Sequence, residues 1–303
     1  FHDIGDYLSR EDKLAKIAEF GSIDGIAKAA SWTAITPDPH GDWLKQRDDS
    51  FDSYIVAGDK SGKSPKLFEN FSLGVVTNRD SWCWNPAKSK VASNMGRLID
   101  FYNRERKRFA KANRGLDSKK RDEAVDGFID TDSTKIAWTR ALKKDLSRDK
   151  AAEFDESSLV VGLYRPFSKQ WLYFNRRLNE MVYQMPRFFP DAAAENVVIG
   201  VSASESRSAW SVSISNRVVS LHATDMVGSQ YFPLYVYGGE AEEQEEAEAQ
   251  QSLDLSEEPK GRAPARRDGI TDEGLACFQA AYPAETLTRE DIFYYVYGLL
   301  HSP

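Results

Sequence analysis

The spacing of apolar residues along the chain predicts several helices. One set recurs at the three- and four-residue intervals that place side chains on one helix face: Val91, Met95, Leu98, Ile99 and Tyr102. This spacing predicts a helix from Ala87 to about Ala112. An N-cap at Ser9 and a stop at Gly21 predict a helix between them. We expect three more helices, at about 133–146, 271–281 and 288–300.

Short apolar runs bounded by turn residues predict the strands of the fold. They lie at residues 53–58, 73–77, 81–84, 158–164, 170–174, 196–202, 209–215, 216–221 and 231–237. The sequence shows no internal repeat. This mixture of elements favours an α+β fold, with a mostly antiparallel β centre and helices around it.

The formal charge of −7 comes from one segment of the chain. Residues 240–260 hold nine acidic residues and one lysine, a net charge of −8, which leaves +1 for the remainder. A low-complexity acidic segment cannot bury a core, so we expect a disordered surface insertion over 239–268. An acidic mimic that competes with DNA is the functional alternative to a solvated loop.

Hydrophobic residues make up 41% of the chain, and no apolar run approaches the roughly 18–20 residues that a membrane span needs. No charged-then-apolar leader opens the sequence. Cys83 and Cys277 form neither a disulfide framework nor a CxxC metal pair, which fits a reducing compartment. We therefore expect a cytoplasmic protein without a membrane partner.

The sequence lacks the common catalytic motifs. It has no GxxxxGK[ST] loop for a triphosphate and no Gly-rich strand–turn–helix for a dinucleotide or S-adenosylmethionine. Asn85-Pro86 is followed by Ala87-Lys88, so the Asn-Pro-Pro-Tyr motif of adenine methyltransferases is missing. The four histidines form no HExxH motif or Cys/His cluster. We expect no catalytic residue, no metal and no cofactor bound by this chain.

A polar run between apolar segments is the first candidate for DNA contact. It consists of Thr77, Asn78, Arg79 and Asp80. Arginine can pair with the guanine edge, asparagine with adenine, and aspartate with the cytosine amino group. A structural turn in which Asp80 and Arg79 pair with each other or with the backbone explains the same residues.

A second candidate interleaves basic and aromatic residues over 164–177. Its basic members are Arg165, Lys169, Arg176 and Arg177. Basic groups contact phosphates, and aromatic rings pack or stack on bases. A strand with an ordinary charged face is the structural alternative.

The end of the helix predicted over 87–112 is strongly basic and is the third candidate. Arg104, Lys107 and Arg108 lie in the run RERKRFAKANR. Such a run suits non-specific phosphate binding, although a solvated helix face has the same composition.

Several long blocks, in order, resemble the C-terminal specificity domain of Type ISP restriction–modification enzymes. They are SLGVVTNRDSWCWNPAKSKVASNMGRLIDFYNRE, YRPFSKQWLYFNRRLN, FFP, QYFPLYVY and ITDEGLACFQAAY with LTREDIFYYVYGLLHSP. WTAITPDPHGDWLKQR is similar to the linker ahead of that domain, and DIGDYLSREDKL to the last strand and helix of the preceding methyltransferase domain. The resemblance implies that residues 1–30 end a methyltransferase domain and its linker helix. Residues 31–303 would then form the target-recognition domain.

The family resemblance also implies a function and partners. A nuclease, an ATP-driven translocase and an adenine-N6 methyltransferase would precede this chain in one polypeptide, and those domains would use S-adenosylmethionine, ATP and magnesium. The chain itself would recognise a sequence in double-stranded DNA. A scaffold between methyltransferase and motor is the second hypothesis, with the aromatic C-terminal helix as its docking surface. A hidden hydrolase or nuclease that uses Asp59, Asp80 and a lysine is the third.

Overall fold

The computed structural model describes residues 2–5, 7–28, 32–39, 41–43, 53–202, 210–224, 228–238 and 265–302. The chain forms two compact units, Phe1–Tyr54 and Ile55–Pro303. We expected a boundary after residue 30, whereas the larger unit begins at Ile55. The side chain of Ile55 packs against an apolar core of that unit, together with residues far along the chain.

The smaller unit contains two helices, α1 (Arg10–Glu19) and α2 (Ile23–Lys28). The predicted N-cap is confirmed, because the Ser9 hydroxyl accepts a hydrogen bond from the Asp12 backbone N–H at 3.1 Å. Gly21, the predicted stop, has a φ of +68°, which glycine adopts without strain. That residues 1–30 end a methyltransferase domain stays a prediction.

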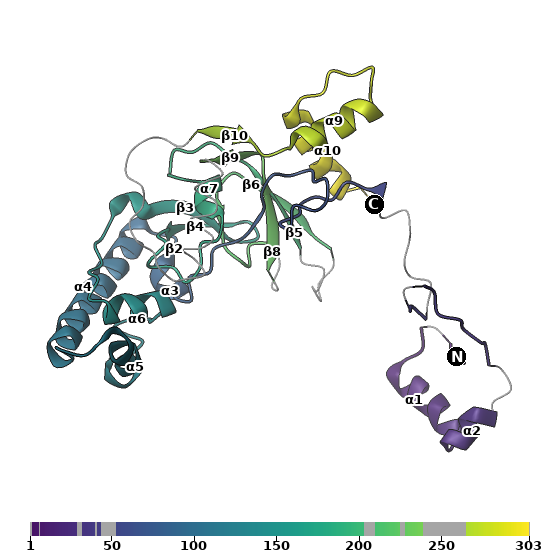
Figure 1. Ribbon diagram of the computed structural model, residues 1–303, viewed down its shortest axis with the longest axis horizontal. Coiled ribbons are helices and arrows are strands. Elements are labelled where there is room, and N and C mark those ends of the chain that lie inside the picture. Colours follow the sequence, from purple (N-terminus) through teal and green to yellow (C-terminus); the bar gives the residue numbers. More distant parts are fainter. Residues whose placement is uncertain are drawn as a thin grey trace. The chain divides into compact units, whose positions relative to one another are not determined.

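The described residues of the larger unit form three small sheets (Figure 1). The first is antiparallel and has the order β1 (Ser72–Leu73), β8 (Ser229–Pro233), β5 (Val198–Ser202), β6 (Val212–Ser215). The second has the order β2 (Trp84–Asn85), β4 (Ser168–Tyr173), β3 (Leu159–Arg165), β7 (Val218–Val219), and its β3–β7 pair is parallel. The third pairs β9 (Tyr235–Tyr237) with β10 (Arg266–Asp268). The predicted α+β class with a mostly antiparallel centre is confirmed.

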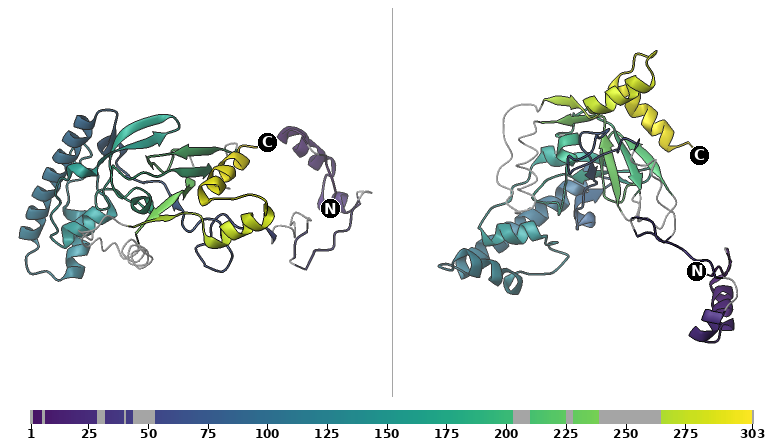
Figure 2. Two further views of the ribbon diagram at one scale, coloured as in Figure 1. Left: turned by 90° about the horizontal axis from the view of Figure 1, so that it is seen from above. Right: turned by 45° about the vertical axis from the view of Figure 1, so that its right-hand side comes forward.

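Helices lie at two ends of this unit. The first group contains α3 (Asp80–Cys83), α4 (Lys88–Ala112), α5 (Ser118–Phe128) and α6 (Arg140–Ser147). The second contains α9 (Asp272–Ala281) and α10 (Arg289–Leu300), away from α4 and α5 in every view (Figures 1 and 2). Two short turns of helix, η2 (Glu156–Ser158) and α7 (Met185–Phe188), lie between strands. Within the described ranges, no helix is both long enough and apolar enough to cross a membrane.

The predicted apolar face of α4 forms the centre of the main core. All five of its predicted residues are buried: Val91, Met95, Leu98, Ile99 and Tyr102. They share one cluster with Leu142 and Leu146 of α6 and with Leu172 and Tyr173 of β4. Removing a leucine-sized side chain from water contributes roughly 1.5–3 kcal/mol, so this face holds α4 and α6 to the second sheet.

Two expected elements differ from the structure because local turn chemistry outweighs the apolar pattern. Residues 81–84 were expected to form a strand, but Trp82 and Cys83 belong to the single helical turn α3, where both are buried. The backbone N–H groups of both residues donate to the Arg79 carbonyl, which closes that turn. The expected run 53–58 forms only an isolated bridge at Val56.

Helix and strand boundaries in the middle of the chain also differ. The helix expected at 133–146 begins only at Arg140, because the Thr139 hydroxyl caps it by accepting from the Leu142 N–H at 3.2 Å. Helix α5 was not expected, and only Val125 of its residues is buried, so its apolar pattern is weak. The run 231–237 is divided after Pro233, where Leu234 separates β8 from β9, and its halves pair in different sheets.

The predicted acidic insertion is shorter at its C-terminal end than we expected. Arg266–Asp268 form strand β10 and pair with Tyr235–Tyr237. The guanidinium of Arg266 lies 4.2 Å from the ring centre of Tyr235, so cross-strand contacts hold this end in the sheet. Residues 239–264 lie outside the described residues, and their predicted disorder stays a prediction.

Gly162 lies in the centre of the second sheet, where β3 pairs with both β4 and β7. A Cβ there would lie 2.7 Å from the Trp84 ring and 2.9 Å from the Val218 carbonyl oxygen. We expect Gly162→Ala to lower the free energy of unfolding by about 1–3 kcal/mol through overpacking, measured by urea titration. Gly96→Ala on α4, where nothing lies within 4 Å, is the matched control and should stabilise by up to about 1 kcal/mol. Equal effects of the two variants would contradict this explanation.

Candidate nucleic-acid interface

The polar run 77–80 forms a tight turn that leads into α3. Thr77 is buried, and its hydroxyl accepts from the Arg79 N–H at 3.2 Å while it donates to the Asp80 carboxylate. These bonds hold the intervening Asn78 in the left-handed region, with a φ of +50°, which asparagine tolerates better than most residues. The Asn78 side chain is exposed. We call residues 77–80 the Thr77–Asp80 turn.

Arg79, which we expected to contact DNA, points into the protein. It is only 3% exposed, and among the described residues none accepts a hydrogen bond from its three guanidinium nitrogens. Burial lowers the pKa of the guanidinium, against the opposing influence of Cys83 and Glu180. Burial also raises the pKa of Cys83 to about 12, so this thiol is neutral and does not balance the charge. The Glu180 carboxylate pairs with Arg140 at 2.5 Å.

The Asp80 carboxylate connects this turn to a hairpin more than eighty residues later in the chain. It accepts from the Tyr164 hydroxyl at 3.0 Å and lies 3.8 Å from a guanidinium nitrogen of Arg165. Burial, and then the nearby Asp80 charge, raise the pKa of Tyr164, so its hydroxyl keeps the proton that it donates. The Thr77–Asp80 turn and the β3–β4 hairpin therefore lie side by side.

Arg165 is held against the same cluster. Its guanidinium stacks 4.0 Å from the ring centre of Tyr164 and donates to the Tyr164 carbonyl at 2.7 Å. A third of its side chain remains exposed. Lys169, on the other strand of the hairpin, is exposed, and Phe167 at the tip is fully so. The structure thus brings Asp80 of the turn together with Arg165 of the hairpin; Asn78 is a chain neighbour of this turn, and Phe167 and Lys169 follow Arg165 along the hairpin.

The arginine pair of this segment, Arg176 and Arg177, lies beyond the far end of β4. Arg177 pairs with the buried Asp145 carboxylate at 2.9 Å and donates to the Ala151 carbonyl at 3.0 Å. It holds α6 to the segment after β4, which is a structural role. Arg176 is half-buried and also has an interaction within the chain.

The basic end of α4 divides into structural and exposed residues. Arg108 donates twice to the buried Glu105 carboxylate, at 3.0 and 2.6 Å, and its guanidinium stacks on Phe128 at 4.1 Å. This hydrogen bonding raises the pKa of Arg108. Arg104 and Lys107 are exposed and lie three residues apart on one helix face.

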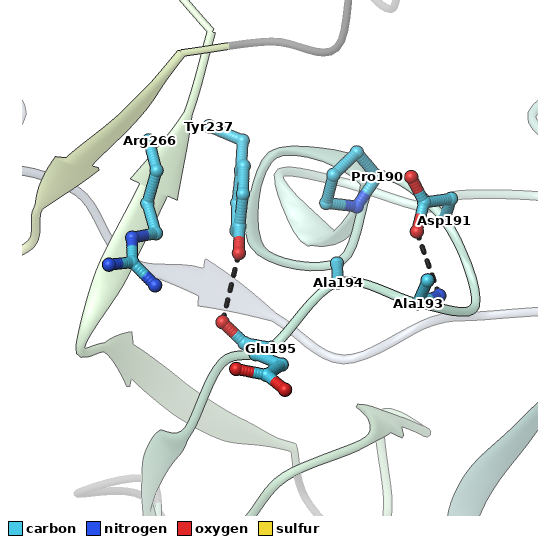
Figure 3. Close-up of a pocket in the computed structure, with 7 residues that line it drawn as sticks. All are labelled: Pro190, Asp191, Ala193, Ala194, Glu195, Tyr237 and Arg266. Atoms are coloured by element: carbon cyan, nitrogen blue, oxygen red, sulfur yellow. Dashed lines mark hydrogen bonds between the residues drawn. The ribbon is translucent and has the colours of Figure 1, made fainter.

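Two other candidate places, a surface pocket and the loop of Asp59, do not have the properties of a DNA-binding site. A pocket of about 350 Å³ beside β9 and β10 is drawn in Figure 3. Its lining residues are Pro190, Asp191, Ala193, Ala194, Glu195, Tyr237 and Arg266. Two carboxylates and one guanidinium give it no excess of positive charge, which phosphate binding requires.

Asp59, proposed above as a hydrolytic acid, organises its own loop. It accepts from the backbone N–H groups of Ser61, Lys63 and Ser64 at 2.7–3.0 Å. Hydrogen bonds, chiefly from Ser61, lower the pKa of Asp59 to about 2. In the part of the chain that the structure describes, no three His, Cys, Asp or Glu side chains are placed to hold a metal ion.

The sequence already contains a signal for the exposed tip of the β3–β4 hairpin. Pro166-Phe167 forms the two-residue loop between β3 and β4. Proline fits the first loop position of a type II turn, whereas the second requires a positive φ and is normally glycine or asparagine. Phenylalanine at the second loop position is therefore unusual, and this can be recognised once the ends of β3 and β4 are known.

Comparison with protein families assigns the fold to a known class of specificity domain. The family model of the Type ISP C-terminal specificity domain matches residues 66–303, and the chain is a member of that family. A comparison with curated proteins finds no match.

Solved structures show the same likeness. The chain is 31% identical, with a TM-score of 0.70, to a nuclease-deletion mutant of the Type ISP restriction–modification enzyme LlaGI in complex with a DNA substrate mimic. It is 30% identical to DrdV in a DNA complex and 28% identical to the ATP-dependent Type ISP enzyme LlaBIII bound to DNA, each with a TM-score of 0.67. The alignments cover 99%, 91% and 99% of this chain but only 20%, 24% and 17% of those proteins.

The buried position of Arg79 leads to a test of its role. We expect Arg79→Met to leave DNA affinity unchanged and to raise the free energy of unfolding by up to about 4 kcal/mol, because it removes an unpaired buried charge. Urea titration measures the stability, and fluorescence anisotropy with a labelled duplex measures the affinity. A stable variant that no longer discriminates between sequences would instead support the base contact that we expected from the sequence.

Proposed function

We propose that this chain recognises a specific sequence in double-stranded DNA as part of a Type ISP restriction–modification enzyme. The observation that carries the proposal is the exposed cluster where the Thr77–Asp80 turn meets the β3–β4 hairpin. Polar, cationic and aromatic side chains lie there on two loops that the partly buried hydrogen bonds of Asp80 join. Rigidly supported loops of this kind are common sites of binding. The DNA complexes of LlaGI, DrdV and LlaBIII support the assignment.

Asn78 is the strongest candidate for a base contact. It is exposed, and in the described part of the chain its side-chain amide has no hydrogen-bond partner. An asparagine amide matches the N6 and N7 groups of adenine in the major groove. Arg165 is the second candidate, because its contact with Asp80 at 3.8 Å is loose enough to exchange for a base or phosphate.

The exposed cations of α4 and the hairpin are proposed to contact phosphates. Arg104, Lys107 and Lys169 are exposed, and such residues fix the orientation of the duplex without discriminating between bases. Arg108 and Arg177 are less suited to that task, because each is bonded to a buried carboxylate.

The remaining activities are proposed for other parts of the same polypeptide. We infer adenine-N6 methylation, ATP-dependent translocation and DNA cleavage by upstream domains, with S-adenosylmethionine, ATP and magnesium bound there. The resemblance to those enzymes supports this, and the chain spans about a fifth of their length. Cellular DNA as partner and two free thiols favour the cytoplasm as location.

A scaffold role is the second candidate, favoured by the aromatic residues of α10. Tyr294, Tyr295 and Leu299 are 45%, 48% and 58% exposed. Such a surface is suited to docking on the methyltransferase or motor domains. Under that alternative, substitutions in the cluster at Asn78 leave DNA affinity intact, whereas substitutions on α10 disturb the assembly.

Asn78→Gly tests base recognition without disturbing the turn, because glycine accepts the positive φ at this position. We expect a loss of about 1–3 kcal/mol in binding to the recognised duplex, with relaxed specificity at one base pair. Non-specific binding should not change. Competition between randomised duplexes, with sequencing of the bound pool, measures both quantities. An unchanged sequence preference would assign Asn78 to the turn alone.

Lys107→Ala tests phosphate contact. Duplex binding should depend steeply on salt, and the variant should reduce the slope of log affinity against log salt by about 0.9, the value for one released counterion. Lys143→Ala is the matched control, because Lys143 already pairs with Asp126 at 2.7 Å. Affinity measured over a salt series distinguishes them, and the same slope in wild type and Lys107→Ala would exclude this lysine from the interface.

A further inference from the structure

Phe167 lies at the tip of the β3–β4 hairpin in a backbone conformation that aromatic residues rarely adopt. Arg165 and Ser168 are paired, so Pro166 and Phe167 alone form the loop. The φ of Phe167 is +62°, in the left-handed region where a Cβ is crowded by the following carbonyl. Glycine or asparagine would fit this position without strain.

Packing within the chain does not compensate for that strain. Phe167 is 103% exposed, whereas Tyr173 of the same hairpin is buried and Trp171 packs against the main core. Among the described residues, no ring or cation is in contact with the Phe167 ring. Exposing a large apolar group and straining its backbone are both unfavourable, and such outliers are concentrated at functional sites.

The hairpin beneath Phe167 is firmly anchored. The Tyr164 carbonyl accepts from the Ser220 hydroxyl and from Arg165, and the Tyr164 hydroxyl donates to Asp80. The Tyr164 ring also packs against Trp84, with ring centres 5.2 Å apart. The backbone that carries the phenyl ring is therefore anchored, which reduces the conformational entropy lost on binding.

We propose that Phe167 stacks on a DNA base at the recognised site, entering the base stack as a wedge. A phenyl ring forms no hydrogen bond and carries no charge, so it can contribute neither a phosphate contact nor a hydrogen bond to a base edge. Stacking on a base and apolar contact with a thymine methyl group are left to it, and an apolar ring at the tip of a hairpin can act as a wedge that partly unstacks a base step. The inference rests on the proposed function, since it supplies a further contact of the same DNA-binding surface.

Two substitutions in the complete polypeptide test the wedge. Phe167→Asn suits the positive φ but removes the ring, and Phe167→Tyr keeps an aromatic ring. The probe is a duplex enriched by the wild-type protein from a pool with a randomised centre, carrying 2-aminopurine at successive positions. We expect Phe167→Asn to bind roughly 5- to 100-fold more weakly, with an unchanged salt slope, and to abolish the 2-aminopurine fluorescence increase. Phe167→Tyr should keep both signals.

Stability and a control variant separate this role from a structural one. Phe167→Asn should not lower the thermal midpoint, because asparagine relieves the strained conformation; a lowered midpoint would indicate a packing role and overturn the proposal. Tyr282→Asn, at an exposed aromatic residue after α9, should leave DNA binding unchanged. If wild type and Phe167→Asn bind the enriched duplex equally, the wedge is wrong while DNA recognition stands. If the wild type enriches no duplex at all, the proposed function itself fails.

Discussion

The Asp80 carboxylate is the group on which the exposed cluster depends. It accepts hydrogen bonds from Thr77 in its own turn and from Tyr164 of the β3–β4 hairpin, and it lies near the Arg165 guanidinium. Two loops more than eighty residues apart in the sequence are thereby held together. Without this carboxylate, the hydroxyl groups of Tyr164 and Thr77 would each lose an acceptor. The turn that contains Asn78 is thereby joined to the hairpin that carries Phe167.

The main core supports that arrangement from beneath. The apolar face of α4, the single turn α3 and the strands β3 and β4 belong to one cluster of buried side chains. Trp84 connects the cluster with the surface, because its ring packs against Tyr164. The loops are therefore fixed to a rigid base, which lowers the entropy that binding must overcome.

The arginines of the chain have very different surroundings, although they look alike in the sequence. Arg108 and Arg177 are bonded to buried carboxylates, Arg79 is enclosed without a partner among the described residues, and Arg104 faces solvent. A guanidinium that is already bonded to a buried carboxylate has fewer N–H groups left for DNA. Fewer of these arginines are therefore free to contact DNA than their number in the sequence indicates.

From the sequence we could predict the elements whose pattern is long and regular. The α4 face, the Ser9 cap, strands β3 to β5 and the last two helices were predictable because periodicity and caps are local properties. The turn α3, helix α5 and the division after Pro233 were missed, since short segments fit more than one period and α5 buries a single residue.

The ordered motif blocks were also sufficient to identify the family, because together they match the family pattern at many positions of the sequence. Which side chains of the site are exposed was decided only by the tertiary structure. Arg79 and Asn78 are neighbours in the chain, yet one is buried and the other faces solvent, and the backbone of Asn78 has a positive φ of +50° there. Phe167 and Asp80 became parts of one surface only through long-range contacts between β3 and the Thr77–Asp80 turn, and no local pattern in the sequence encodes those contacts.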